Sequence, residues 1–335
     1  MTAGSTPARS RAERPERPPR RPTAPDGLVV VDKPQGWTSH DVVGRMRRLA
    51  GTKKVGHAGT LDPMATGVLV VGVGRATRLL TYVVGAEKEY VTTIRLGVGT
   101  TTEDAEGEVT ATTGAAGVTS DAVRAAAATL TGDVLQVPSA VSAIKVDGER
   151  AYARVRAGEQ VELAARPVTI SAFEVTDVRP GPDVAGDSST GANVETVDVD
   201  ARVVCSSGTY VRALGRDLGA ALGVGAHLVA LRRTRVGGYA LVAARTLEQL
   251  EAQADADGVL ATLPLADAAR AAFPVRELDA ADAAALSHGR ALPPTGEPGV
   301  HAAIGPDGTL VALVEDAPGK GGVLARPAVV FAAAG

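Results

Sequence analysis

One carboxylate, Asp62, stands in the loop GHAGTLDPMATG (residues 56–67), which has glycine at both ends. The loop also holds His57, Thr60 and Thr66, and it runs directly into the apolar stretch VLVVGVG. Asp-Pro and glycine are ordinary turn formers, so the residue types alone fit a simple turn. A carboxylate whose backbone is restricted by the following proline could also act as a nucleophile or as a base.

Other chemistries lack their signatures in this chain. Gly72 and Gly74 form a G-x-G after a strand-like run, but Thr77 stands where a dinucleotide-binding loop needs a third small residue. No P-loop motif and no nucleophile-elbow motif occurs. The single Cys205 excludes a disulfide framework, and the five histidines show no metal-ligand spacing. The sequence therefore predicts neither a cofactor nor a metal.

Charge is distributed unevenly along the chain. The net charge is −3, but residues 1–25 carry six Arg and two Glu, a net charge of +4 that leaves −7 for the remainder. Basic residues cluster within that acidic remainder at Arg45, Arg47, Arg48, Lys53 and Lys54, and again at Arg232, Arg233 and Arg235. Such clusters are typical of a local phosphate-binding face, although two solvated helix or strand faces would look the same.

Hydrophobic periodicity and turn residues predict the elements that position these groups. Thr38 or Ser39 is a suitable cap for the first helix. Strands are expected at 27–33, 68–73, 88–97, 167–178, 195–205 and 226–236, with 136–148 extended. Helices are expected near 39–50, 75–84, 120–131, 149–158, 209–222 and 279–288. The pattern is that of an α+β protein.

The length of 335 residues fits about two domains. Residues 1–25 are rich in Pro and Arg and are expected to form a disordered arm. A large domain is expected over 26–250, with a loop insertion at 180–193, and a small α+β module over 273–335. No apolar run approaches a membrane span and the N-terminus lacks a signal peptide, so a cytoplasmic location is expected.

Several motifs occur together in a distinctive order. They are VDKPQGWTS, GHAGTLDPMATG, KEY, CSSGTYVRALGRDLG and GAHLVALRRTRVG. This set resembles the TruB family of tRNA pseudouridine synthases over residues 27–250. The resemblance implies a catalytic domain with a mixed, largely antiparallel sheet and a small C-terminal PUA-like domain that binds RNA. It also implies a cofactor-free isomerase that converts the T-loop uridine of tRNA (tRNA position 55) to pseudouridine on a flipped-out base.

The resemblance assigns roles to residues at matching positions. Asp62 matches the catalytic aspartate, which breaks the C1′–N1 bond by addition to C1′ or by a glycal route before C5 bonds to C1′. Arg212 matches the arginine that pairs with it, and Tyr90 the tyrosine that stacks on the base and helps remove the C5 proton. Four further residues match family positions near the substrate. Tyr210 matches an aromatic residue beside the pocket and Leu231 an apolar wall. His57 matches the histidine that fills the space left by the flipped base, and Lys33 is either a structural or a phosphate-binding residue.

This chain departs from the family pattern at Ser207, and the sequence is also compatible with a second function. Ser207 stands where many members carry lysine, so one phosphate contact is expected to be missing. Arg232 and Arg233 are expected to bind the RNA backbone. The expected partner is tRNA, bound at its T arm. No protein partner is expected, and the enzyme is expected to be a monomer. The alternative is an RNA-binding or tRNA-folding module without required catalysis, for which the carboxylate of Asp62 would not be needed.

Overall fold

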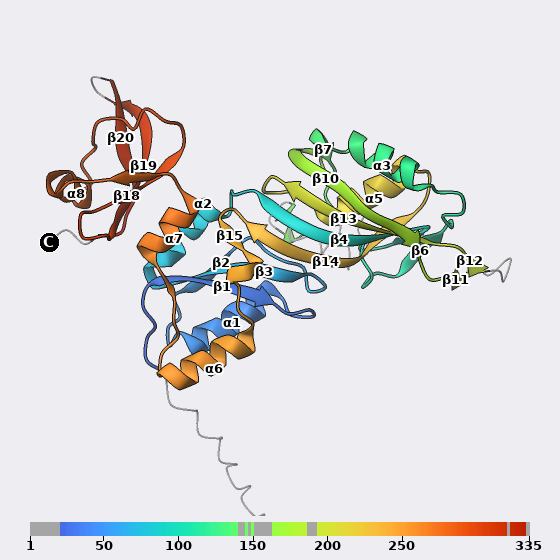
Figure 1. Cartoon of the computed structure of the whole chain (residues 1–335), viewed down its shortest axis with the longest axis horizontal. Helices are drawn as coiled ribbons and strands as arrows, with labels where there is room; N and C mark the ends of the chain where they lie inside the picture. Colours follow the sequence, from blue (N-terminus) through green and yellow to red (C-terminus); the bar gives the residue numbers. More distant parts are fainter. Residues whose placement is uncertain are drawn as a thin grey trace, which may run out of the picture.

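A computed structural model describes residues 21–139, 145–146, 149–150, 163–185, 193–319 and 322–332 (Figure 1). Its helices are α1 (Ser39–Leu49), α2 (Leu80–Val83), α3 (Ser120–Thr129), α5 (Val211–Ala221), α6 (Leu247–Asp257), α7 (Leu265–Ala272) and α8 (Ala280–Ser287), with 3-10 turns η1 (Gly74–Arg78) and η2 (Leu241–Ala243). Most of the helix expected over 149–158 lies outside the described residues.

The strands fall into one large sheet, one smaller sheet and three short ribbons. The large sheet contains β1 (Gly27–Lys33), β2 (Val55–Ala58), β3 (Thr66–Val73), β4 (Lys88–Leu96), β7 (Gly132–Gln136), β10 (Arg166–Pro180), β13 (Val197–Cys205), β14 (Ala226–Val236), β15 (Tyr239–Ala240) and β16 (Leu263–Pro264). The smaller sheet contains β17 (Val275–Glu277), β18 (Val300–Ile304), β19 (Leu310–Gly319) and β20 (Gly322–Val330). The ribbons pair β5 (Val98–Thr100) with β6 (Val109–Thr112), β8 (Lys145–Val146) with β9 (Glu149–Arg150), and β11 (Val184–Ala185) with β12 (Asn193–Val194).

The large sheet follows the order β16-β1-β3-β14-β4-β13-β10-β7. Its described pairings are antiparallel except one: β3 and β14 run parallel, with Thr66 opposite Arg232 and Gly67 opposite Arg233. The predicted α+β fold with a mixed, largely antiparallel sheet is therefore confirmed. The parallel junction brings the end of the 56–67 loop against the centre of the sheet.

Helices cover the two halves of the large sheet separately (Figure 1). α3 and α5 pack on the half that contains β4, β13 and β10 through a core that includes Ile94, Leu214 and Leu218. α1 and α6 pack on β1 and β3. α1 begins where the sequence predicts, because Thr38 and Asp41 form a reciprocal capping box.

The smaller sheet and α8 form a C-terminal domain (Figure 1). It is joined to the rest of the protein by a shared apolar core, which contains Leu28 and Leu79 from one side and Ile304 and Phe331 from the other. The Arg78 guanidinium lies 4.8 Å from the centroid of the Phe331 ring and donates a hydrogen bond to the Val330 carbonyl. This contact area fixes the domain beside η1 and α2.

Several expected boundaries differ in the structure. The large domain continues past residue 250, because Leu250 and Ala254 of α6 pack against α1, and β16 pairs with β1. An arm was expected over 1–25, but Ala24 is buried and its N–H donates to the Ala50 carbonyl, while residues 1–20 lie outside the described residues. The helix expected over 75–84 divides into η1 and α2. The insertion at 180–193 begins and ends in a paired two-residue ribbon.

Candidate active site

The loop that carries Asp62 is held from several sides. Ser39, at the start of α1, exchanges hydrogen bonds with the backbone of Leu61: its hydroxyl accepts from the N–H at 2.9 Å and donates to the carbonyl at 3.2 Å. The N–H of Gly36 donates to the Pro63 carbonyl at 2.8 Å. These contacts on both neighbours of Asp62 fix the direction of its side chain before any substrate binds, which is what a positioned catalytic group requires.

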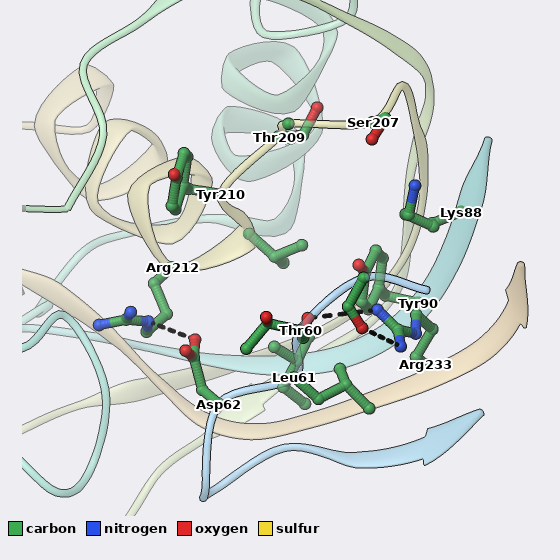
Figure 2. Close-up of a pocket in the computed structure, with 14 residues that line it drawn as sticks. Thr60, Leu61, Asp62, Lys88, Tyr90, Ser207, Thr209, Tyr210, Arg212 and Arg233 are labelled. Atoms are coloured by element: carbon green, nitrogen blue, oxygen red, sulfur yellow. Dashed lines mark hydrogen bonds and ion pairs between the residues drawn. The ribbon is translucent and has the colours of Figure 1, made fainter. Parts of the chain in front are cut away.

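Arg212 contacts Asp62 directly, although the two residues are 150 positions apart. Its Nε donates to Asp62 Oδ2 at 2.9 Å. The Arg212 side chain is 6% exposed, whereas that of Asp62 is 39% exposed and opens to the cleft. The geometry therefore combines a buried cation with a carboxylate that a substrate can reach (Figure 2).

Other groups hold Arg212 in place. Its Nη1 donates to the Thr102 carbonyl at 2.6 Å and to Ser139 Oγ at 3.3 Å, and it lies 3.5 Å from Asp104 Oδ2. Arg212 lies in the first turn of α5, where the helix dipole disfavours a cation. The carboxylates of Asp62 and Asp104 offset this cost, so the arginine is held as part of a charged network.

Tyr90 lies on β4 and lines the same cleft. It is 7% exposed, and burial raises the pKa of its phenol above the ordinary value. The side chain is therefore a neutral phenol near pH 7, with an aromatic face and a hydroxyl available to a bound nucleotide. Period-two alternation along β4 explains its inward direction, since Lys88, Tyr90 and Ile94 share one face.

The cleft has a volume of about 300 Å³ and lies where the loop between β2 and β3 meets β4, β14 and the start of α5. The residues that line it are Gly59, Thr60, Leu61, Asp62, Lys88, Tyr90, Ser207, Gly208, Thr209, Tyr210, Val211, Arg212, Leu231 and Arg233. Six of the nine residues singled out from the sequence are among them: Asp62, Tyr90, Arg212, Tyr210, Leu231 and Arg233.

Lys33 lies outside this cleft and is fully buried. Its ammonium donates to the carbonyls of Trp37, Pro34 and Pro63 at 2.6, 3.0 and 3.2 Å. Burial lowers the pKa of Lys33 to about 8. Of the two roles expected for Lys33, the geometry fits the structural one, because all three N–H donors already stabilise the chain next to Asp62.

Arg233 was expected to bind the RNA backbone, but it is 1% exposed. Its guanidinium donates to the carbonyls of Val68, Gly59 and Thr60 at 2.7, 3.1 and 3.4 Å. These bonds join β14 to both ends of the Asp62 loop. The buried guanidinium is thus part of the scaffold of the cleft, and the expected backbone contact does not fit its position.

Arg232 and His57 also lie outside the lining of the cleft. Arg232 pairs with Asp32 at 2.6 Å, and its side chain is 37% exposed. His57, on β2, contacts His40 edge to face with 5.8 Å between ring centroids. Burial, followed by the nearby His40, lowers the pKa of His57, so its ring is neutral at pH 7. In this structure neither side chain reaches the cleft.

Three residues of the site were missed in the sequence. Lys88 stands two positions before Tyr90 in KEY, so strand alternation could have placed it on the same face. Asp104 and Ser139 contact Arg212, but they come from a polar loop and from the residues after β7. No local pattern marks them, because their role depends on where distant segments meet.

The described part of the chain has neither a metal-binding cluster nor a membrane-spanning helix. No group of three or more His, Cys, Asp and Glu side chains there has an arrangement that could hold a metal ion. Within the same residues, no helix combines the length and the apolar character needed to cross a membrane.

Comparison with known proteins agrees with the site geometry. Residues 47–211 match the family described as "TruB family pseudouridylate synthase (N terminal domain)". Residues 212–265 match "tRNA pseudouridylate synthase B C-terminal domain", and residues 273–332 match "tRNA Pseudouridine synthase II, C terminal". The matched segments include Asp62, Tyr90 and Arg212.

Curated relatives are similar over nearly their whole length. The chain is 59% identical over 315 residues to tRNA pseudouridine synthase B of Arthrobacter sp. (strain FB24), covering 91% of this chain and 96% of the relative. It is 57% identical over 311 residues to the protein of the same name from Streptomyces griseus, covering 92% and 98%.

Solved structures give the same result at lower identity. A chain from "Crystal Structure of a Cbf5-Nop10-Gar1 Complex" is 27% identical with a TM-score of 0.68, over 92% of this chain and 85% of that chain. A chain from "Structure of H/ACA RNP bound to a substrate RNA containing 2'-deoxyuridine" is 25% identical with a TM-score of 0.65, over 92% and 86%. With its family matches, its close relatives and its Asp62–Arg212 pair, this chain belongs to the TruB family of tRNA pseudouridine synthases.

Proposed function

We propose that this enzyme converts the T-loop uridine of tRNA (position 55) to pseudouridine. The observation that carries the proposal is the Asp62–Arg212 ion pair, whose carboxylate opens into a cleft beside the buried Tyr90. The relatives named tRNA pseudouridine synthase B support tRNA as the substrate. A cytoplasmic location agrees with the buried, unpaired thiol of Cys205.

The substrate must first leave the base stack of the RNA. Flipping a nucleotide costs a few kcal/mol, whereas stacking of the base on one aromatic side chain returns about 1–3 kcal/mol. We assign the stacking role to Tyr90, with Tyr210 and Leu231 as further walls of the cleft. In the proposal His57 occupies the space that the base leaves, which requires it to contact RNA from outside the cleft.

Asp62 acts once the uridine is in the cleft. Its carboxylate either attacks C1′ or removes a ribose proton to give a glycal, and both routes break the C1′–N1 bond. The uracil then turns within the cleft and C5 bonds to C1′. This step breaks the Asp62–C1′ bond on the addition route, or returns the abstracted proton to the ribose on the glycal route, and the proton on C5 is then lost. Arg212 holds the carboxylate in position toward the ribose, because Nε donates to it at 2.9 Å. Tyr90, a neutral phenol, relays the C5 proton by accepting it as its own proton passes to a further acceptor.

The test measures pseudouridine in a T-arm stem–loop and in full-length tRNA under single-turnover conditions. The wild-type enzyme should modify one uridine, at position 55. Asp62→Asn keeps the size of the side chain but removes the attacking charge, so turnover should fall to background while RNA binding is retained. The matched control Asp267→Asn changes an exposed carboxylate in the first turn of α7 and should leave turnover unchanged.

Two results would contradict the proposal. Substantial turnover by Asp62→Asn would mean that Asp62 is a turn residue, and modification at another position would exclude the T-loop assignment. If tRNA binds and folds but no pseudouridine forms with the wild-type enzyme, the RNA-binding alternative stands. Tyr90→Phe adds a second readout: it keeps stacking, so bond cleavage should persist while final proton removal slows.

A further inference from the structure

Two cations lie at the end of the cleft away from the Asp62–Arg212 pair, Lys88 on β4 and Arg233 on β14 (Figure 2). Both approach Gly59: a Cβ atom at that glycine would be 3.6 Å from Lys88 Cε and 3.6 Å from Arg233 Nη1. Tyr90 lies beside them in the same view. The cleft therefore has a carboxylate at one end, and an aromatic ring and two positive charges at the other end.

The hydrogen bonds of Lys88 differ from those of the other buried lysine. Lys33 donates to three carbonyls and has no donor left. Lys88 donates to the carbonyls of Val84 and Ala86 at 2.8 and 2.7 Å, and these are its hydrogen bonds to described residues. An ammonium has three N–H donors, so one of them remains for a group in the cleft that Lys88 lines.

The charge of Lys88 is not balanced by an ion pair within the described residues. The groups that act on its charge are the Arg233 guanidinium, from β14, and the Cys205 thiol, from β13. Glu87 and Glu89, its sequence neighbours, are engaged by Arg235 and Arg202. A buried cation without a carboxylate partner is costly, and an anion that forms beside it recovers that cost.

The reaction produces such an anion. When the C1′–N1 bond breaks, its electron pair leaves with N1, and the detached uracil carries one negative charge spread over its ring and carbonyl oxygens. We propose that Lys88 stabilises this uracil anion by donating its remaining N–H to a carbonyl oxygen of the base. The proton stays on Lys88; the electron pair forms the new C5–C1′ bond, and the proton lost from C5 restores N1–H.

This role rests on the proposed function and deepens it. It uses a preorganised charge where negative charge develops, which is the arrangement that lowers a barrier most effectively in a water-poor site. A purely structural role is the competing explanation, because Lys88 also closes the turn at 84–86. The two roles can be distinguished: the rate depends on how well the departing uracil carries negative charge only if Lys88 stabilises the uracil anion.

The experiment varies the leaving group. Single-turnover rate constants are measured for T-arm RNA with uridine or with 5-fluorouridine at the target, the latter followed by fluorine NMR of the rearranged nucleotide. Fluorine makes the departing base a more stable anion. Lys88→Met should slow the uridine reaction by about 10²–10³-fold, as loss of one such donor does. Lys88→Met should slow the 5-fluorouridine reaction by a factor at least ten times smaller than the factor by which it slows the uridine reaction. Its RNA affinity should stay within about threefold of that of the wild-type enzyme.

Lys33→Met is the matched control. It removes a buried lysine with the same lowered pKa of about 8, but one whose ammonium donates to three carbonyls outside the cleft. Lys33→Met should lower the melting temperature and should slow the reactions of both substrates by the same factor. The melting temperature and circular dichroism of each variant show whether it is folded at the assay temperature.

The pH profile gives an independent readout. Burial and the neighbouring Arg233 lower the pKa of Lys88 to about 8, so the side chain carries its positive charge below that pH and loses it above that pH. Burial raises the pKa of the neighbouring Cys205 to about 11 and that of Tyr90 above its usual value, so neither group titrates near pH 8. Lys33 also has a pKa of about 8, but it lies outside the cleft, and the pH profile of Lys33→Met measures its contribution. The wild-type uridine rate should therefore fall as pH rises through about 8, and Lys88→Met should lack this fall.

Three outcomes would overturn the inference. If Lys88→Met slows the uridine and 5-fluorouridine reactions by the same factor, Lys88 has only the structural role of closing the turn at 84–86. A tenfold weaker RNA affinity with an unchanged rate constant would make it a phosphate contact. A descending limb that persists in Lys88→Met would assign the titration to another group. Failure of the wild-type enzyme to form pseudouridine would instead refute the proposed function, so the two failures are distinct.

Discussion

Arg232 and Arg233 are neighbours in the sequence, but strand alternation directs them to opposite faces of β14. Arg232 remains partly exposed and pairs with Asp32, whereas Arg233 is enclosed and donates to three backbone carbonyls. A pair of adjacent arginines looked like one phosphate-binding unit in the sequence. At the residue scale they have separate functions, because burial decides which partners each guanidinium can reach.

Replacing Arg233 should therefore affect the scaffold. Arg233→Met removes donors from the carbonyls of Val68, Gly59 and Thr60, and each buried acceptor left unpaired costs about 1–3 kcal/mol. The free energy of unfolding, measured in urea, should fall by roughly 3 kcal/mol or more, and turnover should fall with it.

The salt dependence of tRNA binding distinguishes this role from a phosphate contact. Loss of one phosphate contact changes the slope of log K against log salt by about one. Arg233→Met should leave that slope unchanged. A flatter slope would return Arg233 to the RNA-binding surface expected from the sequence.

At the scale of elements, the parallel contact between β3 and β14 depends on Gly67. Its φ is +98°, in the region that favours glycine, and a Cβ atom there would be 2.2 Å from the Arg233 carbonyl oxygen. The two backbones therefore meet more closely than any side chain allows. This contact joins the Asp62 loop to the strand that carries Leu231 and Arg233.

Gly67→Ala should separate the two strands. The clash is with backbone, so it cannot be relieved by a rotamer change, and the left-handed conformation alone costs about 1–3 kcal/mol. We expect a drop of more than 3 kcal/mol in the free energy of unfolding and a large loss of turnover.

Gly44→Ala is the control at the same scale. Gly44 lies within α1 at an exposed position, and a Cβ atom there would meet nothing within 4 Å. Alanine should stabilise the helix by roughly 0.5–1 kcal/mol. If Gly67→Ala proves as well tolerated as Gly44→Ala, the close strand contact does not hold the site together.

At the scale of the whole molecule, residues near both ends of the described part of the chain pack against the large domain. Ala24 is 5% exposed in the core formed with α1 and α6, and Arg21 pairs with Asp255 of α6. The C-terminal sheet shares its core with β1 and α2. Both contacts lie away from the cleft, so they contribute to stability and to the position of the C-terminal domain.

Two deletions separate the charged N-terminal segment from this packing. Removal of residues 1–20 should leave the melting temperature and kcat unchanged and should weaken tRNA affinity only at low salt, because five of the six arginines among residues 1–25 are lost. Removal of residues 1–25 also deletes Ala24 and its hydrogen bond, at a cost of about 1–2 kcal/mol. A collapse of kcat in the shorter deletion would place that segment in the active site.

Local patterns in the sequence were sufficient for most elements. Alternation in KEYVTTIRL predicted the strand β4 and the capping residues predicted the start of α1, whereas the glycines and the proline around Asp62 by themselves fit only a turn, and its catalytic role came from the resemblance of several ordered motifs to the TruB family. The strand and the helix start depend on neighbours within a few positions, so the sequence contains all the information that determines them.

Only the tertiary structure decided how distant segments meet. It brought Arg212 to Asp62 across 150 positions, enclosed Arg233, and placed Lys88 in the lining of the cleft. It also joined α6 and β16 to the large domain, where the composition had suggested a boundary. The physical reason is that strand pairing and burial depend on the whole chain: a charged residue has the same local pattern whether its partner is water, a carbonyl or a distant carboxylate.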